Sequence, residues 1–294
     1  MIQLNVFTDV FGLKGWTGWS DIIGTVFKDG CPNPKLNDVQ IQAVQEADKV
    51  ALKAFLPDMT EAFKLILVVD AIRRVRPDVM INLNLPYLPF ARQDRVCNEG
   101  EANGVAAIAK VINMLEFSAV ALLDPHSDVP AGAIERCMIR DLSQVINAPG
   151  AMGWMNWANT WLVAPDAGAV KRVKALVKKL GAAGMITASK ERDPETMELT
   201  KIVFDEDPTG KTILVADDLC DGGRTFIGLS KAIKAIGEPK ELHLWVTHGI
   251  FSYGTEIVTE HFDTVCTTNS FHYEAEGQKD AQGNTNPKMN WVRV

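Results

Sequence analysis

The segment 213–226 constrains the fold of this chain more than any other. It reads Ile-Leu-Val-Ala-Asp-Asp-Leu-Cys-Asp-Gly-Gly-Arg-Thr-Phe. The apolar run Ile213–Val215 is typical of a buried parallel strand, and Phe226 and Leu229 begin a series of apolar residues at helical spacing. A strand that passes through a short glycine loop into a helix predicts an α/β fold with a parallel sheet.

The loop between this strand and this helix has the chemistry of a sugar-phosphate site. Gly222 and Gly223 permit unusual backbone angles and close approach of a ligand, and the unpaired N–H groups of a first helical turn favour a phosphate. The carboxylates of Asp217 and Asp218 can accept hydrogen bonds from vicinal sugar hydroxyls or hold Mg²⁺. The segment alone leaves a second interpretation open, an ordinary turn with exposed acids.

Composition limits the classes of protein to which the chain can belong. With 294 residues it is long enough for two domains, and 47% hydrophobic and 23% charged residues are typical of a globular protein. There is no apolar run long enough to cross a bilayer and no basic-then-apolar start. We therefore expect a cytoplasmic protein without a membrane partner.

The net charge and the spacing of the cysteines argue against further kinds of partner and cofactor. The net charge is −7 and no basic run interleaves with aromatic residues, so nucleic acid is not an expected partner. An anionic ligand must therefore be bound by a local cluster of positive charge. The five cysteines include no C-x-x-C pair, which predicts reduced thiols rather than disulfides or a zinc site.

Strand-like and helix-like segments alternate along the chain, which predicts α/β layers with mainly parallel sheets flanked by helices. Further strands are expected at 79–85, 118–123, 160–164 and 185–188. Turn formers cluster at 147–150. We place a boundary there between a first domain, 1–146, and a second, 147–294, whose tail is free to pack back on the first.

Two helices are expected where the pattern allows more than one interpretation. Residues 58–75 contain an apolar run that also suits a buried strand, but Asp58 and Glu61 resemble a capping box and favour a helix. Residues 168–180 are amphipathic, with a basic side that includes Arg172. We interpret that basic side as a solvated face.

Charged side chains follow three other predicted strands, at the positions where open α/β sheets place their ligands. Arg92 and Arg95 suit phosphate oxygens, unless they only pair with neighbouring acids. His126 is a candidate to ligate Mg²⁺ or to stabilise a leaving phosphate, and the alternative is a structural histidine. Asp166 is a candidate ligand of a cation or a sugar hydroxyl, or a helix N-cap.

A further strand end carries Lys190 and Arg192 ahead of the polar stretch 194–200, which has no clear periodicity. A mobile cationic loop can close over a polyphosphate and neutralise the charge of a phosphoryl-transfer transition state. A mixed-charge loop that is only solvated is the other interpretation.

Nine short segments carry a resemblance to one family over most of the chain. They are Phe27-Lys-Asp29-Gly30, Asp70-Ala-Ile-Arg-Arg74, Arg92-Gln-Asp-Arg95, Asp124-Pro-His126, Pro165-Asp-Ala-Gly168, Lys190-Glu-Arg192, Asp217-Asp218, Asp221-Gly-Gly-Arg-Thr225 and Thr247-His-Gly249. In this order they resemble the ribose-phosphate pyrophosphokinases, also called PRPP synthetases. The resemblance implies two phosphoribosyltransferase-like α/β domains with the active site between them, and a homo-oligomer, either a dimer or a hexamer.

The resemblance implies Mg²⁺-dependent transfer of the diphosphoryl group of ATP to O1 of ribose 5-phosphate, which gives PRPP and AMP. The residues implied for ATP are Phe27 and Asp29 at adenine, with Arg92, Gln93 and Asp94. Those implied for the metal are His126 and Asp166, and those for catalysis are Lys190, Arg192 and His126. Those implied for ribose 5-phosphate are Asp217, Asp218, Asp221, Gly222, Gly223, Arg224 and Thr225.

The chain departs from the family pattern in the segment 96–101, where the family carries basic residues, and at three positions of the candidate site. Cys31 stands where the family's adenine loop carries glutamate, and Gly222 and Arg224 replace a threonine and a glycine of its sugar-phosphate loop. Two alternatives are kept. The acidic pair and glycine loop alone would allow a PRPP-consuming phosphoribosyltransferase, and the departures motivate a non-catalytic regulatory subunit that resembles a PRPP synthetase. The second domain, His126 and the Lys190 segment count against the first alternative.

Overall fold

The computed structural model describes residues 1–294 except 11–12, 148–150, 167, 193–198 and 281. The side chains of residues 8–14 and 190–201 also lie outside the description. The chain divides into two compact units, Met1–Arg140 and Asp141–Val294, each with its own core. The boundary predicted after residue 146 stays a prediction. No helix in the described part of the chain is long and apolar enough to span a bilayer.

The first unit is built on a seven-stranded sheet with the order β2-β1-β6-β7-β8-β9, in which β3 also pairs with β1. Its strands are β1 (Ile2–Val10), β2 (Leu13–Trp16), β3 (Ser20–Asp21), β6 (Lys49–Ala54), β7 (Met80–Leu85), β8 (Ala119–Leu123) and β9 (Cys137–Arg140). Strands β6 to β9 run parallel, whereas β1 is antiparallel to its three neighbours. The strands predicted at 79–85 and 118–123 are confirmed as β7 and β8.

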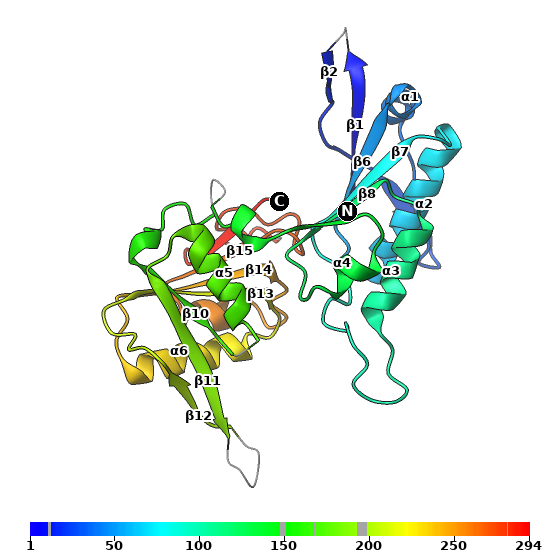
Figure 1. Cartoon of the computed structure of the whole chain (residues 1–294). Coiled ribbons are helices and arrows are strands. Elements are labelled where there is room, and N and C mark those ends of the chain that lie inside the picture. The colour runs from blue at the N-terminus through cyan, green and yellow to red at the C-terminus, as the bar shows by residue number, and fades with distance from the viewer. Residues whose placement is uncertain (11–12, 148–150, 167, 193–198, 281) are drawn as a thin grey trace. The chain divides into compact units, whose positions relative to one another are not determined.

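Helices cover one face of this sheet (Figure 1). They are α1 (Asp38–Glu46), α2 (Met59–Val75), α3 (Gly104–Met114) and α4 (Val129–Ala133), and β4 (Gly24–Val26) with β5 (Pro32–Pro34) forms a separate hairpin. Alternate residues of the strands are fully buried, such as Val50 and Leu52 on β6, and they join the core with Val68 and Ile72 of α2. This period of two is expected for strands with one covered face.

The helix interpretation of residues 58–75 is confirmed by α2. Asp58 caps the helix, because its carboxylate accepts a hydrogen bond from the backbone N–H of Glu61 at 2.9 Å. The Glu61 side chain pairs with Lys64 at 3.3 Å instead of closing the capping box. A complete capping box is present at the start of α1, between Asn37 and Gln40.

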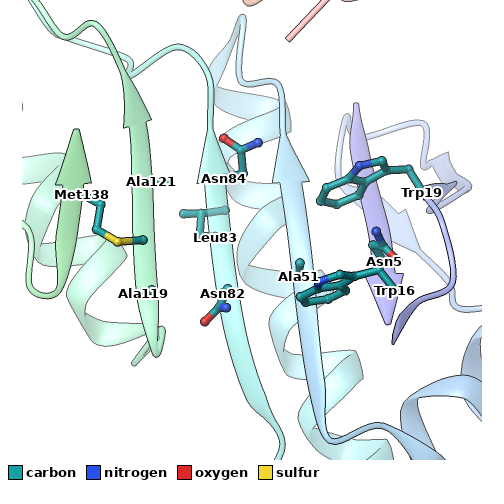
Figure 2. Close-up of a pocket in the computed structure, with 10 residues that line it drawn as sticks. All are labelled: Asn5, Trp16, Trp19, Ala51, Asn82, Leu83, Asn84, Ala119, Ala121 and Met138. Carbon is teal, nitrogen blue, oxygen red and sulfur yellow. The ribbon is translucent and has the colours of Figure 1, made fainter. Parts of the chain in front are cut away.

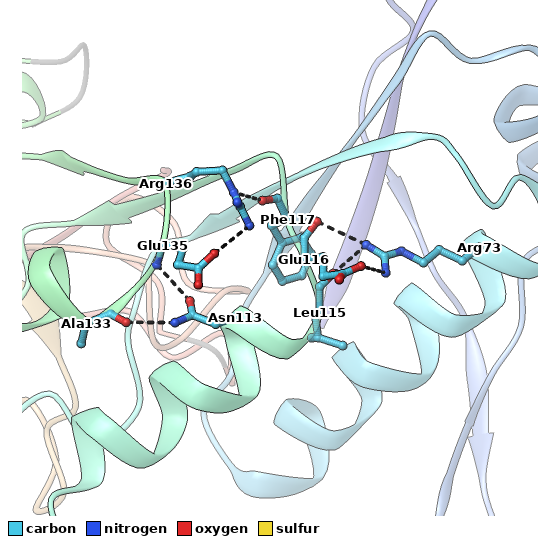
Figure 3. Close-up of polar contacts among 8 residues, drawn as sticks. All are labelled: Arg73, Asn113, Leu115, Glu116, Phe117, Ala133, Glu135 and Arg136. Atoms are coloured by element: carbon cyan, nitrogen blue, oxygen red, sulfur yellow. Dashed lines mark hydrogen bonds and ion pairs between the residues drawn. The ribbon is translucent and has the colours of Figure 1, made fainter.

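Two arginines hydrogen-bond to the short segment that connects α3 to β8 (Figure 3). Arg73 of α2 donates to the carbonyl of Leu115 at 2.8 Å, and Arg136 donates to the carbonyl of Phe117 at 2.7 Å. The bond to Leu115 satisfies a carbonyl that the end of α3 leaves without a partner. The bond to Phe117 holds the segment that leads into β8.

The second unit is built on another seven-stranded sheet, with the order β12-β11-β10-β13-β14-β15-β16. Its strands are β10 (Thr160–Ala164), β11 (Gly184–Arg192), β12 (Leu199–Phe204), β13 (Thr212–Cys220), β14 (Glu241–Gly249), β15 (Thr264–Thr268) and β16 (Met289–Val292). Its helices are α5 (Val170–Leu180), α6 (Arg224–Ile236) and α7 (Glu256–Thr259), with 3₁₀ turns η1 (Leu142–Gln144) and η2 (Trp157–Asn159).

Of the strand pairs in this second sheet, five are parallel and one, β11 with β12, is antiparallel. The strands predicted at 160–164 and 185–188 are confirmed as β10 and as part of β11. Helices α5 and α6 flank the sheet (Figure 1), and Phe226 and Leu229 of α6 are buried as predicted. The α/β fold class with mainly parallel sheets and flanking helices is confirmed.

Strand β13 corrects one expectation, because it does not end at Val215. Its ladder with β14 pairs Asp217 with Val246 and continues to Cys220 opposite Gly249. Asp217 and Asp218 therefore lie on the strand, and the glycine loop begins only at Asp221. The added backbone hydrogen bonds to β14 explain why the strand continues through an acidic pair.

Candidate functional site

The strand order of the second sheet reverses between β10 and β13. From β10 the chain passes through α5 to β11 on one side, and from β13 it passes through α6 to β14 on the other. Open α/β sheets bind ligands outside the carboxyl ends of the strands at such a reversal. Asp166 follows β10 there, while Asp217, Asp218 and Asp221 lie at or after the end of β13. The fold thus brings four of the predicted carboxylates to one edge of one sheet.

The acidic pair on β13 has a cationic neighbour that we did not predict. The Arg172 guanidinium of α5 lies 3.2 Å from Asp218 Oδ1 and 3.7 Å from Asp217 Oδ1 (both measured from Nη1). Asp218 is buried, with 6% of its surface exposed, so its charge needs such a partner. The interpretation of Arg172 as part of a solvated face was wrong, because α5 lies beside the end of β13.

Burial and the neighbouring charge of Asp218 raise the pKa of Asp217 to about 7, while Arg172 acts in the opposite direction. The pair therefore gains or loses a proton near neutral pH. In the ionised form both carboxylates accept hydrogen bonds, as vicinal hydroxyls of a sugar require.

The glycine loop is shaped by contacts that exclude side chains. Gly223 has φ +73° and starts α6, and a Cβ there would lie 2.7 Å from Cγ2 of Val258. A Cβ on Gly222 would lie 3.0 Å from the ring of Tyr253. The side chains of Arg224 and Thr225 in the first turn of α6 are exposed. The loop therefore leads directly into the amino-terminal end of a 13-residue helix, which favours an anion.

Asp166 lies in the turn between β10 and α5 and bonds to its backbone. Its Oδ1 accepts a hydrogen bond from the backbone N–H of Ala169 at 3.1 Å, ahead of α5. The side chain is exposed, so its second oxygen also faces solvent. The N-cap of α5 is Ala169, with no side-chain cap, so the capping interpretation of Asp166 is wrong, and its role at a metal stays a prediction.

The Thr247-His-Gly249 segment lies at the carboxyl end of β14 and ties it to β15. His248 Nδ1 lies 2.8 Å from Ser270 Oγ, and both residues are buried. The hydroxyl of Thr268 donates to the carbonyl of Thr247 at 2.6 Å. These bonds hold the carboxyl end of β14 against β15 and the residues that follow it.

The backbones of Lys190 and Arg192 lie on β11, opposite Ile202 and Leu199 of β12. Their side chains, and residues 193–198 of the predicted mobile loop, lie outside the described residues. The far end of that predicted loop needs correction, because Leu199 and Thr200 already belong to β12. Backbone pairing with β11 produces order there without any apolar periodicity.

In the first unit, the carboxyl ends of the neighbouring strands β7 and β8 bring two predicted residues together. Asp94 accepts a hydrogen bond from the Ser127 side chain, which holds the pKa of Asp94 below its ordinary value, with smaller contributions from Arg95 and His126. Arg95 Nε lies 3.4 Å from Asp94 Oδ1. Asp94 and His126 are thus neighbours although they are far apart in the sequence.

The backbone at these two strand ends departs from ordinary conformations. Phe90 after β7 has φ +63°, and Asp124 after β8 has φ +40°. Such values cost free energy in residues other than glycine and occur often at functional sites. Gln93 packs close to the start of α3, where a Cβ on Gly104 would lie 2.5 Å from its side-chain oxygen. Gln93 and Asp94 are therefore held by α3 at the sheet edge.

Phe27 and Asp29 lie in the turn of the β4–β5 hairpin, apart from the parallel sheet. The Phe27 ring is exposed, and Asp29 Oδ1 accepts the backbone N–H of Cys31 at 3.0 Å. That hydrogen bond holds the pKa of Asp29 below its ordinary value. The role of Phe27 and Asp29 at adenine stays a prediction.

A separate hollow lies on the face of the first sheet that carries Trp16, Trp19 and Met138 (Figure 2). Asn82 and Asn84 of β7 also line it, and none of the predicted site residues does. Among the described residues, no group of three or more His, Cys, Asp or Glu side chains is placed to hold a metal ion.

The fold and the acidic strand end define a class of protein. A family model for the phosphoribosyl transferase domain matches residues 133–275, which include β10 to β15 and the glycine loop. The phosphoribosylpyrophosphate synthetase structure from Mycobacterium smegmatis superposes with a TM-score of 0.75 at 20% identity, over 93% of this chain and 86% of that chain. The protein thus has the phosphoribosyltransferase type of α/β fold.

Similar sequences narrow this class. A ribose-phosphate pyrophosphokinase from Thermococcus kodakarensis is 25% identical over 84% of this chain and 91% of its own length. One from Bordetella parapertussis is 29% identical over 76% of this chain and 71% of its own length. The chain is therefore similar to ribose-phosphate pyrophosphokinases over most of its length.

Proposed function

We propose that this protein is an enzyme that transfers the diphosphoryl group of ATP to O1 of ribose 5-phosphate. The observation that carries the proposal is the carboxyl end of β13, where an acidic pair is followed by a glycine loop and the start of α6. The names of the relatives support the same reaction. The products are PRPP and AMP, so the enzyme supplies precursors for nucleotide synthesis.

The chemistry asks for alignment and charge neutralisation rather than covalent help. O1 attacks the β-phosphorus of ATP, the bond from that phosphorus to the bridging oxygen of AMP breaks, and the proton of O1 passes to solvent. Asp217 and Asp218 bind the ribose hydroxyls, and the loop from Asp221 to Thr225 binds the 5-phosphate. No side-chain nucleophile is needed, and we assign no general base.

The ATP side is assigned to the first unit. Arg92, Gln93 and Asp94 bind the nucleotide at the end of β7, and Phe27 and Asp29 bind adenine. Lys190 and Arg192 neutralise the charge that develops on the transferred group, together with His126.

A magnesium ion fits the residues present without a protein cage. Mg²⁺ keeps several waters and is usually bound by one or two carboxylates together with substrate phosphates. His126, which lies beside Asp94, and the exposed Asp166 are the candidate metal-binding residues of their respective units. A bound ion would supply positive charge to the polyphosphate. A cytoplasmic location and a homo-oligomer, dimer or hexamer, are part of the same proposal.

The test is the release of AMP from ATP, GTP, CTP or dATP with ribose 5-phosphate and Mg²⁺. We expect ATP to be used and AMP to appear only when the sugar phosphate is present. Lys190→Ala and Arg192→Ala should each lower turnover by about two orders of magnitude or more, with little change in affinity for ribose 5-phosphate. Consumption of PRPP only with an added base would favour a phosphoribosyltransferase, and no turnover with any nucleotide would favour a regulatory subunit.

A further inference from the structure

The turn after β14 is bonded to the glycine loop. The backbone N–H groups of Ile250 and Phe251 both donate to the carbonyl of Cys220, at 2.8 and 3.2 Å. The hydroxyl of Ser252 donates to the carboxylate of Asp221. Hydrogen bonds therefore hold the glycine loop after Cys220 against the turn after β14.

This turn contains two residues with positive φ, and Tyr253 between them is exposed. Phe251 has φ +49° although it is not glycine, and its ring is buried. Gly254 has φ +86° and closes the turn with a hydrogen bond to the Phe251 carbonyl at 2.9 Å. Strained backbone of this kind persists where the surrounding structure fixes it. Between these two residues, Tyr253 is 66% exposed.

The ring of Tyr253 takes the space that a side chain at position 222 would need. A Cβ on Gly222 would lie 3.0 Å from Cε2 and 3.2 Å from Cδ2 of that ring. Cε2 neighbours the ring carbon that carries the hydroxyl, so the hydroxyl also lies near the loop. Gly222 itself offers only backbone groups to a ligand.

We propose that Tyr253 borders the sugar-phosphate loop and donates its hydroxyl to the 5-phosphate of the bound sugar. This inference rests on the proposed function, because it assumes that the loop holds a sugar phosphate. A phenol is a neutral donor at pH 7, and a hydrogen bond to an anionic oxygen is stronger than one between neutral groups. Tyr253 is then a specificity-determining residue that supplies the side-chain donor Gly222 lacks.

The direct test titrates ribose 5-phosphate calorimetrically into the whole protein without nucleotide. Tyr253→Phe keeps the ring and removes the hydroxyl, so we expect the Kd for ribose 5-phosphate to rise about tenfold. The melting temperature and the Kd for ATP should stay unchanged, which a merely structural role would not predict. An unchanged Kd for ribose 5-phosphate overturns the inference.

A second pair of variants tests the packing of the ring on the loop. Gly222→Thr alone should weaken ribose 5-phosphate binding, because the new side chain collides with Tyr253. Adding Tyr253→Gly to Gly222→Thr should restore part of that binding, and simply additive losses contradict the matched packing. If the wild-type protein binds no ribose 5-phosphate, the proposed function fails. If it binds and Tyr253→Phe binds equally well, only the inference about Tyr253 fails.

Discussion

At the scale of the residue, the end of β13 carries one aspartate whose charge is buried and a second aspartate that titrates near neutral pH. Asp218 is held by Arg172, and burial with the charge of Asp218 raises the pKa of Asp217 to about 7. The aspartates could be predicted from the sequence, since they follow an apolar strand ahead of two glycines. Arg172 could not, because helical spacing sorts apolar from polar positions and does not tell which strand end a polar position meets.

Asp217 predicts a dependence of stability on pH. Its pKa is about 7 in the folded protein, against 3.8 for an ordinary Asp, so the folded state keeps a proton that the unfolded chain has released. Its contribution to stability is therefore fully present below about pH 4 and is lost as the pH rises through about 7. Asp217→Asn should flatten this fall, measured as the free energy of unfolding in denaturant between about pH 5 and about pH 8.

The control for this experiment is Glu260→Gln, which removes one negative charge from an exposed position after α7. It should keep the wild-type dependence on pH. Equal slopes in the wild type and in Asp217→Asn would contradict the raised pKa.

At the scale of elements, the parallel strands with short apolar runs could be predicted, and β7, β8 and β10 are confirmed almost residue for residue. Strand β14 escaped prediction as a strand because it buries polar side chains, among them His243, whose pKa is lowered by burial, and Thr247. Strand β12 also escaped, since only its ladder with β11 defines it. Such strands are specified by their neighbours rather than by their own periodicity.

The start of α6 predicts opposite effects for two glycines of the same segment. Gly223→Ala puts a Cβ at φ +73° and 2.7 Å from Val258, so we expect a loss of about 2 kcal/mol in the free energy of unfolding. Gly228→Ala is the matched control, because it lies exposed inside α6 with nothing within 4 Å of a new Cβ. It should stabilise the protein by about 0.5–1 kcal/mol. Denaturant unfolding of both variants is the measurement, and a loss at Gly228 equal to that at Gly223 would contradict this reading of the loop.

At the scale of the whole molecule, the chain carries its candidate residues on two units with separate cores. The residues that we assign to ATP lie at the ends of β7 and β8 and in the β4–β5 hairpin, and those that we assign to the sugar lie at the end of β13. The sequence order of the motifs predicts this division, because each motif follows its own strand, and the ligand of each unit stays a prediction. It could not predict that β1 and its two N-terminal partners would extend the first sheet with antiparallel strands.

The central claim is that a diphosphoryl group moves as one unit from ATP to ribose 5-phosphate. Phosphorus NMR of the purified protein with ATP, ribose 5-phosphate and Mg²⁺ follows the β-phosphorus directly. Our account predicts equal amounts of AMP and of a diphosphate attached to C1 of the sugar, with no signal when the sugar phosphate is omitted. Formation of ADP, or of AMP with free pyrophosphate and unchanged ribose 5-phosphate, would contradict it.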